Sequence, residues 1–433
     1  MHTSSHHPFV YGIDFGTSNS SVSVWDREQR SVMDHPLLRH QEPTLMYFPH
    51  ARAFGANTRE LFFGQEAIDH YIADNMDGRL LQAIKTILPD ETFTETIINN
   101  ETYTIEELVA HHLRNLKLRA DRATGIDGKD VILGRPAVFH EDPKRDHLAE
   151  NRLRSAARLA GFETIHFQYE PIAAARTYET SLTQPQTVLV GDFGGGTSDF
   201  TLMRLDPAKR FLNDREVDVL ATGGVPSAGN RLDAEVMWYK LTPLFGRNAT
   251  YSEFGREKIL PVPTWPHHQI CQWDRVPFLN KDIRLIEKLE HFVRRSDQPE
   301  GFTRLLSLIR RNLGFSLFQQ IERSKIRLTT EDRTHLTFPD AVISISESFD
   351  FREFREMTAS VTTAITSALD TTLARAGLDP DTIDCVFLTG GSSLVRNIRS
   401  IFTDRFGEDR IRTGDTFASV SRGLALSAPL FER

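Results

Sequence analysis

Two short segments, far apart in the chain, share one pattern of apolar and glycine residues. The first runs from Tyr11 to Val24 (YGIDFGTSNSSVSV) and the second from Val188 to Leu202 (VLVGDFGGGTSDFTL). Each pattern predicts a buried strand, an Asp-Phe-Gly turn and a second strand, because glycine adopts the positive φ that a tight hairpin needs. The copies are too far apart for a tandem repeat, so we expect an ancient domain duplication and two similar lobes.

Helical periodicity alternates with apolar strands after the first hairpin. Apolar residues at helical spacing predict a helix from Thr104 to about Ala120, and Thr104 with Glu107 is typical of a capping box at its start. The next pattern predicts, in order, a strand, a helix, a strand and a helix, at 130–139, 142–160, 164–169 and 170–180. This alternation favours a layered α/β fold.

The remaining pattern is mainly helical. We expect residues 80–88 to be helical, and the apolar spacing over 304–327 predicts one long amphipathic helix within a helical section at about 233–326. A buried strand is predicted at 383–389, before a glycine pair, and a closing helix at 417–430. The second half of the chain thus repeats the plan of hairpin, helices and strand.

Composition narrows the classes of function. At 433 residues the chain exceeds what one hydrophobic core usually supports, which favours two lobes with a cleft between them. The formal charge of −8 gives no basic field for nucleic acid or anionic lipid, and no apolar run has the length of a membrane span. With only two cysteines, Cys271 and Cys385, a disulfide framework is excluded and a cytoplasmic location is expected.

The glycine turns are the candidate chemistry. Successive backbone N–H groups without bulky side chains suit phosphate oxygens, and Asp14 and Asp192 can hold the water shell of Mg²⁺. One such turn alone would indicate only a hairpin, whereas two predict a polyphosphate site. The third turn, Gly390-Gly391, could take a flat nucleoside against its backbone or serve only strand-to-helix packing. The chain has no GxxxxGK[ST] phosphate loop.

These three turns, in this order and with FQYEPIAAA at 167–175 between the first two, resemble the superfamily of actin, sugar kinases and heat-shock-70 proteins. The sequence is most similar to DnaK-type chaperones and their short YegD-like branch. The resemblance implies the actin-like ATPase (ribonuclease H-like) fold, an α/β fold with two similar lobes around a nucleotide cleft. Lobe I is expected at 1–183 plus a C-terminal helix at 412–433, and lobe II at 184–411.

Each lobe is expected to carry a small subdomain, at about 46–124 in lobe I and, mainly helical, at about 230–344 in lobe II. No peptide-binding domain is expected after Arg433. The resemblance implies ATP or ADP with Mg²⁺ as ligands, and it assigns residues to them. Catalytic roles are implied for Lys85, which would orient the attacking water, and for Glu170, Asp192 and Thr197. Water-mediated metal contacts are implied for Asp14, Asp192 and Asp199. Nucleotide contacts are implied for Gly16, Thr17, Ser18, Asn19, Gly194, Gly195, Gly196, Thr197, Gly229, Glu322, Lys325, Ile326, Gly390, Gly391, Ser392, Leu394 and Asp415.

Several of these residues have a simpler interpretation. Lys85 could be a solvated lysine on a helix face, and Glu322 and Lys325, assigned to the ribose hydroxyls, could be an i,i+3 salt pair. Ile326 and Leu394 stand where better-known relatives have two arginines around the adenine. An apolar pair can still pack on the ring and loses only the cation–π contribution of about 0.5 to 2 kcal/mol per contact.

The sequence therefore predicts a slow, Mg²⁺-dependent ATPase that acts as a chaperone-like conformational switch. ATP would bridge the two lobes, and client or co-chaperone proteins would respond to the lobe angle. Two alternatives stay open: a non-enzymatic, nucleotide-responsive scaffold, and a small-molecule kinase of the same superfamily, which would need a second substrate pocket and an aspartate as general base.

Overall fold

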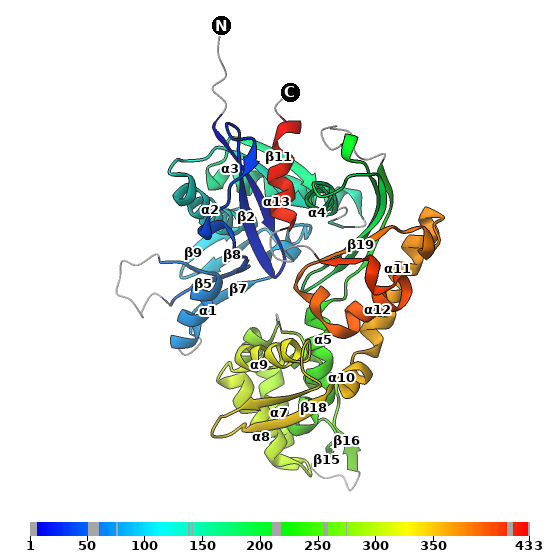
Figure 1. The fold of residues 1–433 in the computed structure, drawn as a ribbon. Coiled ribbons are helices and arrows are strands. Elements are labelled where there is room, and N and C mark those ends of the chain that lie inside the picture. The colour runs from blue at the N-terminus through cyan, green and yellow to red at the C-terminus, as the bar shows by residue number, and fades with distance from the viewer. Residues whose placement is uncertain are drawn as a thin grey trace. The chain divides into compact units, whose positions relative to one another are not determined.

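The computed structural model describes the chain over residues 7–50, 60–74, 77–136, 139–140, 142–209, 218–253, 259–273, 275–413 and 419–431. The chain divides into two compact units. Unit 1 comprises residues 1–226, 367–393 and 402–433, and unit 2 comprises residues 227–366 and 394–401 (Figure 1). The predicted boundaries of lobes I and II and of their subdomains stay predictions.

Unit 1 contains two mixed sheets with the same plan. In each, an antiparallel hairpin is extended by an antiparallel strand on one side and by two parallel strands on the other. The first sheet has the order β11-β10-β1-β2-β3, and the second has the order β14-β13-β12-β19-β20. Their strands are β1 (Phe9–Phe15), β2 (Asn19–Asp26), β3 (Ser31–Val32), β10 (Asp130–Arg135), β11 (Thr164–Tyr169), β12 (Gln186–Phe193), β13 (Ser198–Leu205), β14 (Val219–Val225), β19 (Cys385–Thr389) and β20 (Ile411–Thr413). The two predicted Asp-Phe-Gly hairpins, β1–β2 and β12–β13, are both confirmed. The positive φ expected of their glycines was wrong: Gly16, Gly194 and Gly196 do not have it, and Gly16 is instead required because a Cβ there would overlap the Asn19 carbonyl.

The helices around the first sheet have capped ends. Thr104 and Glu107 form the expected capping box at the start of α2. Asp142 caps α3, and Gly161, with φ 105°, ends it as the left-handed residue that a helix C-terminus favours. The helices of this part are α1 (Gly64–Ala73), α2 (Ile105–Thr124), α3 (Pro143–Ala160) and α4 (Glu170–Glu179).

Helix α13 (Ser419–Leu426), which belongs to the predicted closing helix, lies beside β1, β2 and α4 (Figure 1). The approach is close because glycines face backbone: a Cβ on Gly423 would overlap the Ala173 carbonyl, and one on Gly12 would overlap the backbone of Ala425. Val10, Trp25, Val190 and Leu424 belong to the buried apolar cluster around this helix. This packing holds β1 and α4 in place, and both elements carry residues of the candidate site.

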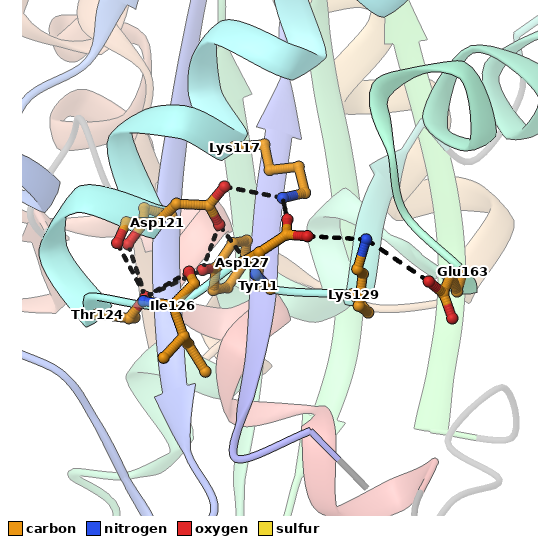
Figure 2. Close-up of polar contacts among 10 residues, drawn as sticks. Tyr11, Lys117, Asp121, Thr124, Ile126, Asp127, Lys129 and Glu163 are labelled. Carbon is orange, nitrogen blue, oxygen red and sulfur yellow. Dashed lines mark hydrogen bonds and ion pairs between the residues drawn. The ribbon is translucent and has the colours of Figure 1, made fainter.

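A polar network fixes the other end of β1. The buried Tyr11 hydroxyl donates to Asp121 at 2.8 Å, and Asp121 also accepts from Lys117, which is paired with Asp127 (Figure 2). Lys129 extends the network by pairing with Asp127 at 2.9 Å. Because Asp121 and Lys117 belong to α2, the network ties this helix to the strand that carries Asp14.

A small three-stranded sheet replaces the predicted helix at 80–88, which was wrong. Residues Arg79–Gln82 form β7, which pairs antiparallel with β5, and only Ile84–Ile87 form a short 3-10 helix, η2. Ala83 between them has φ 53°, which interrupts any continuous helix. The additional strands of this region are β4 (Glu42–Pro43), β5 (Leu45–Phe48), β6 (Phe62–Phe63), β8 (Glu95–Ile98) and β9 (Glu101–Thr104).

Unit 2 is mainly helical. The single long helix predicted over 304–327 was wrong: α8 (Pro299–Arg310) and α9 (Gly314–Arg327) are separated by Asn312, whose φ is 54°. The amide of Leu313 donates to the Leu308 carbonyl, so the break is a hydrogen-bonded helix end. The other elements that lie wholly in this unit are α5 (Gly229–Val236), α6 (Trp265–Ile270), α7 (Ile283–Arg295), α10 (Phe351–Met357), β15 (Thr250–Ser252), β16 (Ile259–Pro261), β17 (Arg333–Phe338) and β18 (Ile345–Asp350). The residues of α11 (Ala359–Ala376) and α12 (Arg396–Phe406) are divided between the two units.

Two expectations from composition can be compared with the structure. Over the described ranges, none of the helices combines the length and the apolar character that crossing a bilayer requires. Cys385 is a buried free thiol in β19 and Cys271 is also free, so neither cysteine forms a disulfide, as expected.

Candidate functional site

The two Asp-Phe-Gly turns come together in unit 1. We call residues 16–19 the first turn and residues 194–197 the second turn. A Cβ on Gly196 of the second turn would lie 3.8 Å from the Thr17 methyl group of the first. Within the second turn, the Gly194 amide donates to the Thr197 carbonyl at 3.1 Å. The structure therefore brings together two glycine turns that the sequence places far apart.

Aspartates stand at the base of both turns. Asp14 lies in β1 opposite Ser21 of β2, and Asp192 lies in β12 opposite Asp199 of β13. The base of the first hairpin therefore has an acid paired with a serine, and the base of the second hairpin has two acids paired with each other. The Thr197 hydroxyl donates to Asp199 at 2.7 Å and holds this carboxylate in place. Asp199 keeps solvent-accessible surface although protein atoms surround it.

These carboxylates disfavour one another's charge. The pKa of Asp14 is raised to about 7, mainly by burial and then by the charge of the nearby Glu170, while Lys85 opposes the shift. The pKa of Asp192 is also raised well above its usual value, mainly by burial and then by the charges of Asp14 and Glu170. The pKa of Asp199 rises to about 6, again mainly through burial. Several acids that repel one another form a site that a cation would stabilise.

The buried Lys85 contributes a positive charge beside these carboxylates. It lies in η2, is only 9% exposed, and its ammonium donates to the Glu170 carboxylate at 2.8 Å. Burial lowers the pKa of Lys85, but the charges of Glu170 and Asp14 outweigh burial, so the net shift is upward and the lysine stays charged. The alternative of a solvated lysine on a helix face is therefore wrong. Glu170 is the first residue of α4, where a carboxylate is favoured by the helix dipole.

The third turn packs directly on the second. Gly390 has φ 80°, and a Cβ there would lie 2.9 Å from an Asp192 carboxylate oxygen and overlap the Phe193 carbonyl. The Ser392 hydroxyl donates to the Gly194 carbonyl at 2.8 Å. Gly390 and Ser392, which follow β19, therefore lie at the base of the second turn. Close packing there explains at least in part why residue 390 is a glycine.

The residues fit a hydrated divalent cation better than a directly ligated one. Among the described residues, no group of three or more histidine, cysteine, aspartate or glutamate side chains is arranged to hold a metal ion directly. Mg²⁺ usually keeps several waters and takes few protein ligands. The orphaned, buried Ser21 hydroxyl opposite Asp14 has no hydrogen-bond partner in the described part of the chain, so it is available to a water. Asp14, Asp192 and Asp199 are the acids that would hold such a hydrated ion.

The residues expected to contact ribose and adenine belong to unit 2. Lys325, in α9, is buried and donates to Asp233 of α5 at 2.7 Å, so the i,i+3 salt pair with Glu322 is not what holds it. Burial raises the pKa of Asp233 to about 6, and Lys325 opposes the shift. Ile326 is 57% exposed and Leu394 is 42% exposed. Gly229, at the start of α5, accepts from the Lys325 ammonium through its carbonyl at 3.4 Å. Asp415 lies outside the described residues.

Sequence reasoning missed two residues around these groups. Asp233 is 92 positions from its partner Lys325, and no local pattern connects them. The Thr44 hydroxyl donates to the Gly16 carbonyl at 2.8 Å, although the Pro-Thr-Leu segment that contains Thr44 matches no functional motif. Only Thr44 has a feature visible in the sequence, because it is a threonine that directly precedes an apolar run.

Taken together, the unit 1 site offers backbone turns for phosphates, acids for a hydrated cation and a buried lysine beside them. These are the parts that phosphoryl transfer to water requires, since that reaction needs mainly alignment and charge neutralisation.

Comparison with known proteins gives one consistent result. The family model described as "Hsp70 protein" matches residues 10–247 and 310–432. Three curated relatives are chaperone proteins DnaK: 24% identity to that of Thermosipho africanus, and 23% to those of Mycoplasmopsis synoviae and Thermosipho melanesiensis. The matches cover 98%, 96% and 99% of this chain, but only 59%, 58% and 60% of the relatives' lengths.

Proposed function

The chain belongs to the Hsp70 family, and therefore has the actin-like ATPase fold; we propose that it binds ATP or ADP with Mg²⁺ and slowly hydrolyses ATP. The single observation that carries the proposal is the buried Lys85–Glu170 pair, 2.8 Å long, beside Asp14 and the two facing turns. A solvated lysine or a lone glycine hairpin would not support it. The combination of cation, acids and paired turns does.

The proposed roles follow from the positions of the residues. Backbone N–H groups of the first and second turns bind the phosphate oxygens and neutralise charge that develops on them. The Lys85 ammonium orients a water toward the γ-phosphorus, and Glu170 keeps that ammonium charged and in place. Thr197, fixed by Asp199, orients the same region of the second turn. When bound, Mg²⁺ supplies Lewis-acid stabilisation of the phosphate oxygens.

The proposed reaction is hydrolysis by water. A water oxygen forms a bond to the γ-phosphorus while the bond to the β,γ-bridging oxygen breaks, so ADP leaves, and the protons of the water stay on the released phosphate or pass to solvent. Glu322, Lys325, Ile326 and Leu394 stay predictions for ribose and adenine contacts. The conformational-switch role, client or co-chaperone partners, a cytoplasmic location and a place in the short YegD-like branch are likewise proposals from the resemblance.

The test is a single-turnover assay with γ-labelled ATP, with and without Mg²⁺ and without any added acceptor. Metal-dependent release of inorganic phosphate supports the ATPase. Binding without release would instead favour the nucleotide-responsive scaffold. Transfer of the label only after a small hydroxylated acceptor is added would favour the kinase, and absence of binding would overturn the proposal.

A further inference from the structure

Both phosphate turns contain the same hydrogen bond from outside the hairpin. In the first turn, the Thr44 hydroxyl donates to the Gly16 carbonyl at 2.8 Å. In the second turn, the Ser392 hydroxyl donates to the Gly194 carbonyl, also at 2.8 Å. Gly16 and Gly194 are the corresponding glycines of the two Asp-Phe-Gly sequences. Their hydroxyl donors come from unrelated segments, one just before β5 and one just after β19.

The repeated bond matters because a turn that binds phosphate must show its N–H groups and not its carbonyls. A peptide carbonyl oxygen carries partial negative charge and would repel a phosphate oxygen nearby. A hydroxyl that donates to this carbonyl satisfies it and fixes the orientation of the peptide plane. The neighbouring N–H groups then stay in the direction that an anion requires, before any ligand binds.

Thr44 is held firmly enough to act in this way. It is 1% exposed, and its amide donates to the Ser18 carbonyl at 2.8 Å, so it contacts the first turn at two points. Its single hydroxyl proton is used for Gly16, so the Ser20 hydroxyl, 2.8 Å away, is the donor in their mutual bond. The neighbouring Glu42 accepts from Asn115 of α2 at 2.8 Å. The segment around Thr44 is thus anchored on the helix side.

Ser392 is held in a comparable way. It is 8% exposed, and the turn that carries it is closed by the Ser393 hydroxyl, which donates to the Gly390 carbonyl at 2.6 Å. Gly390 packs against Phe193 and Asp192 at the base of the second turn. Ser392 therefore reaches Gly194 from a short, well-fixed segment.

We propose that Thr44 and Ser392 are positioning residues of the two phosphate turns: each fixes the carbonyl of one turn glycine, so that the turn is preorganised for the phosphates of ATP. The proposal rests on the proposed function for the identity of the ligand. It assigns Ser392, expected to contact the nucleotide itself, to the second turn. Thr44 gains a role that its sequence context does not suggest.

The test compares Thr44→Val, which keeps the side-chain shape and removes the hydroxyl, with the conservative Thr44→Ser and with Ser392→Ala. Thr372→Val is the matched control, because Thr372 is a buried threonine whose hydroxyl donates to the Ala368 carbonyl of its own helix, α11, and to neither turn. Hydrogen–deuterium exchange is measured on the ligand-free full chain, at the amides of residues 44 and 194. ATP binding with Mg²⁺ is measured in parallel, together with the rate constant of hydrolysis at saturating ATP.

We expect exchange at residue 44 to accelerate about 3- to 10-fold in Thr44→Val, and exchange at residue 194 by a similar factor in Ser392→Ala. ATP affinity should fall by about the same factor in each, while Thr44→Ser and Thr372→Val stay close to the unmodified protein. If Thr44→Val does not fold, Ser392→Ala tests the same relationship in the other turn. Unchanged exchange in the folded variants overturns the proposal, as does faster exchange with unchanged ATP affinity. If the unmodified protein binds no ATP, the proposed function fails, and the exchange rates alone decide whether the hydroxyls hold the turns.

Discussion

The Lys85 ammonium and the Glu170 carboxylate form a 2.8 Å ion pair that joins a short 3-10 helix to the first residue of α4. Both side chains are largely removed from water, at 10% and 13% exposure. Two buried opposite charges are stable only with each other or with further partners. The pair therefore fixes Lys85 beside Asp14 and Asp192, which supports the proposed role of Lys85 in orienting the attacking water.

Replacing this lysine should remove hydrolysis while leaving some binding. In Lys85→Ala we expect the single-turnover rate constant to fall by about 10²-fold or more, because the group that orients the water is lost and Glu170 is left without its cation. Rapid-quench measurement of labelled phosphate checks this. Lys144→Ala, at an exposed lysine of α3, is the control and should behave like the unmodified protein. An unchanged rate in Lys85→Ala would remove Lys85 from the mechanism.

The role of Asp192 is separable from folding. Asp192→Asn keeps the shape of the β12 end but removes one negative charge from a group of acids that repel one another. We expect the protein to fold at least as stably as before, while the Mg²⁺ concentration that half-saturates hydrolysis rises about tenfold. A magnesium titration of the turnover rate measures this. Asp379→Asn, at an exposed aspartate, should leave the titration unchanged, and an identical result for Asp192→Asn would contradict the proposed metal role.

Acid should destabilise the protein through His112. This imidazole is fully buried in α2, neither ring nitrogen has a hydrogen-bond partner among the described residues, and burial lowers its pKa to about 3. The unfolded chain takes up a proton near the usual value of 6.5, whereas the folded chain does not, so the free energy of unfolding falls as the pH drops from that value toward 3. The loss attributable to His112 is about 2 kcal/mol at pH 5.

The measurement is urea unfolding of the ligand-free protein at several pH values, with His112→Leu beside it. The variant should lose less stability than the unmodified protein between pH 7 and pH 5. His147→Leu, at an exposed histidine of α3, serves as the control and should keep the original pH dependence. Parallel pH profiles for the unmodified protein and His112→Leu would show that His112 does not titrate as proposed.

The buried Lys325–Asp233 pair should behave as a unit. Asp233→Ala leaves the Lys325 ammonium, 7% exposed, without its carboxylate, and we expect a loss of about 3 kcal/mol in the free energy of unfolding. Adding Lys325→Met should recover part of that loss, because no buried charge remains. Chemical unfolding of Asp233→Ala, of Lys325→Met and of the double variant gives the comparison. The exposed pair Arg352–Glu356 provides the control, since Glu356→Ala should cost well under 1 kcal/mol. Additive effects of the two substitutions would contradict the coupling.

Local sequence determined the hairpins, several helices and the glycine turns. The Asp-Phe-Gly turns could be recognised because an apolar run predicts a buried strand and the glycines that follow it favour a turn. The caps at Thr104 and Gly161 are set by hydrogen bonds and dihedral preferences within a few residues, so their positions were also predictable. The resemblance to the Hsp70 family rests on these same local motifs, and the family match confirms it.

Tertiary structure decided what the local pattern could not. Residues 79–82 became a strand because β5 offers them a pairing edge, and the helix predicted over 304–327 was divided at Asn312, where the chain adopts a positive φ despite continuous apolar spacing. Whether Lys85 was a surface residue or a buried ion-pair partner depended on Glu170, 85 residues away. The same holds for Asp233 and Thr44, whose partners lie far along the chain. Ion pairs and hydrogen bonds between polar residues far apart in the chain leave no local periodicity, so the sequence pattern could not assign these partners.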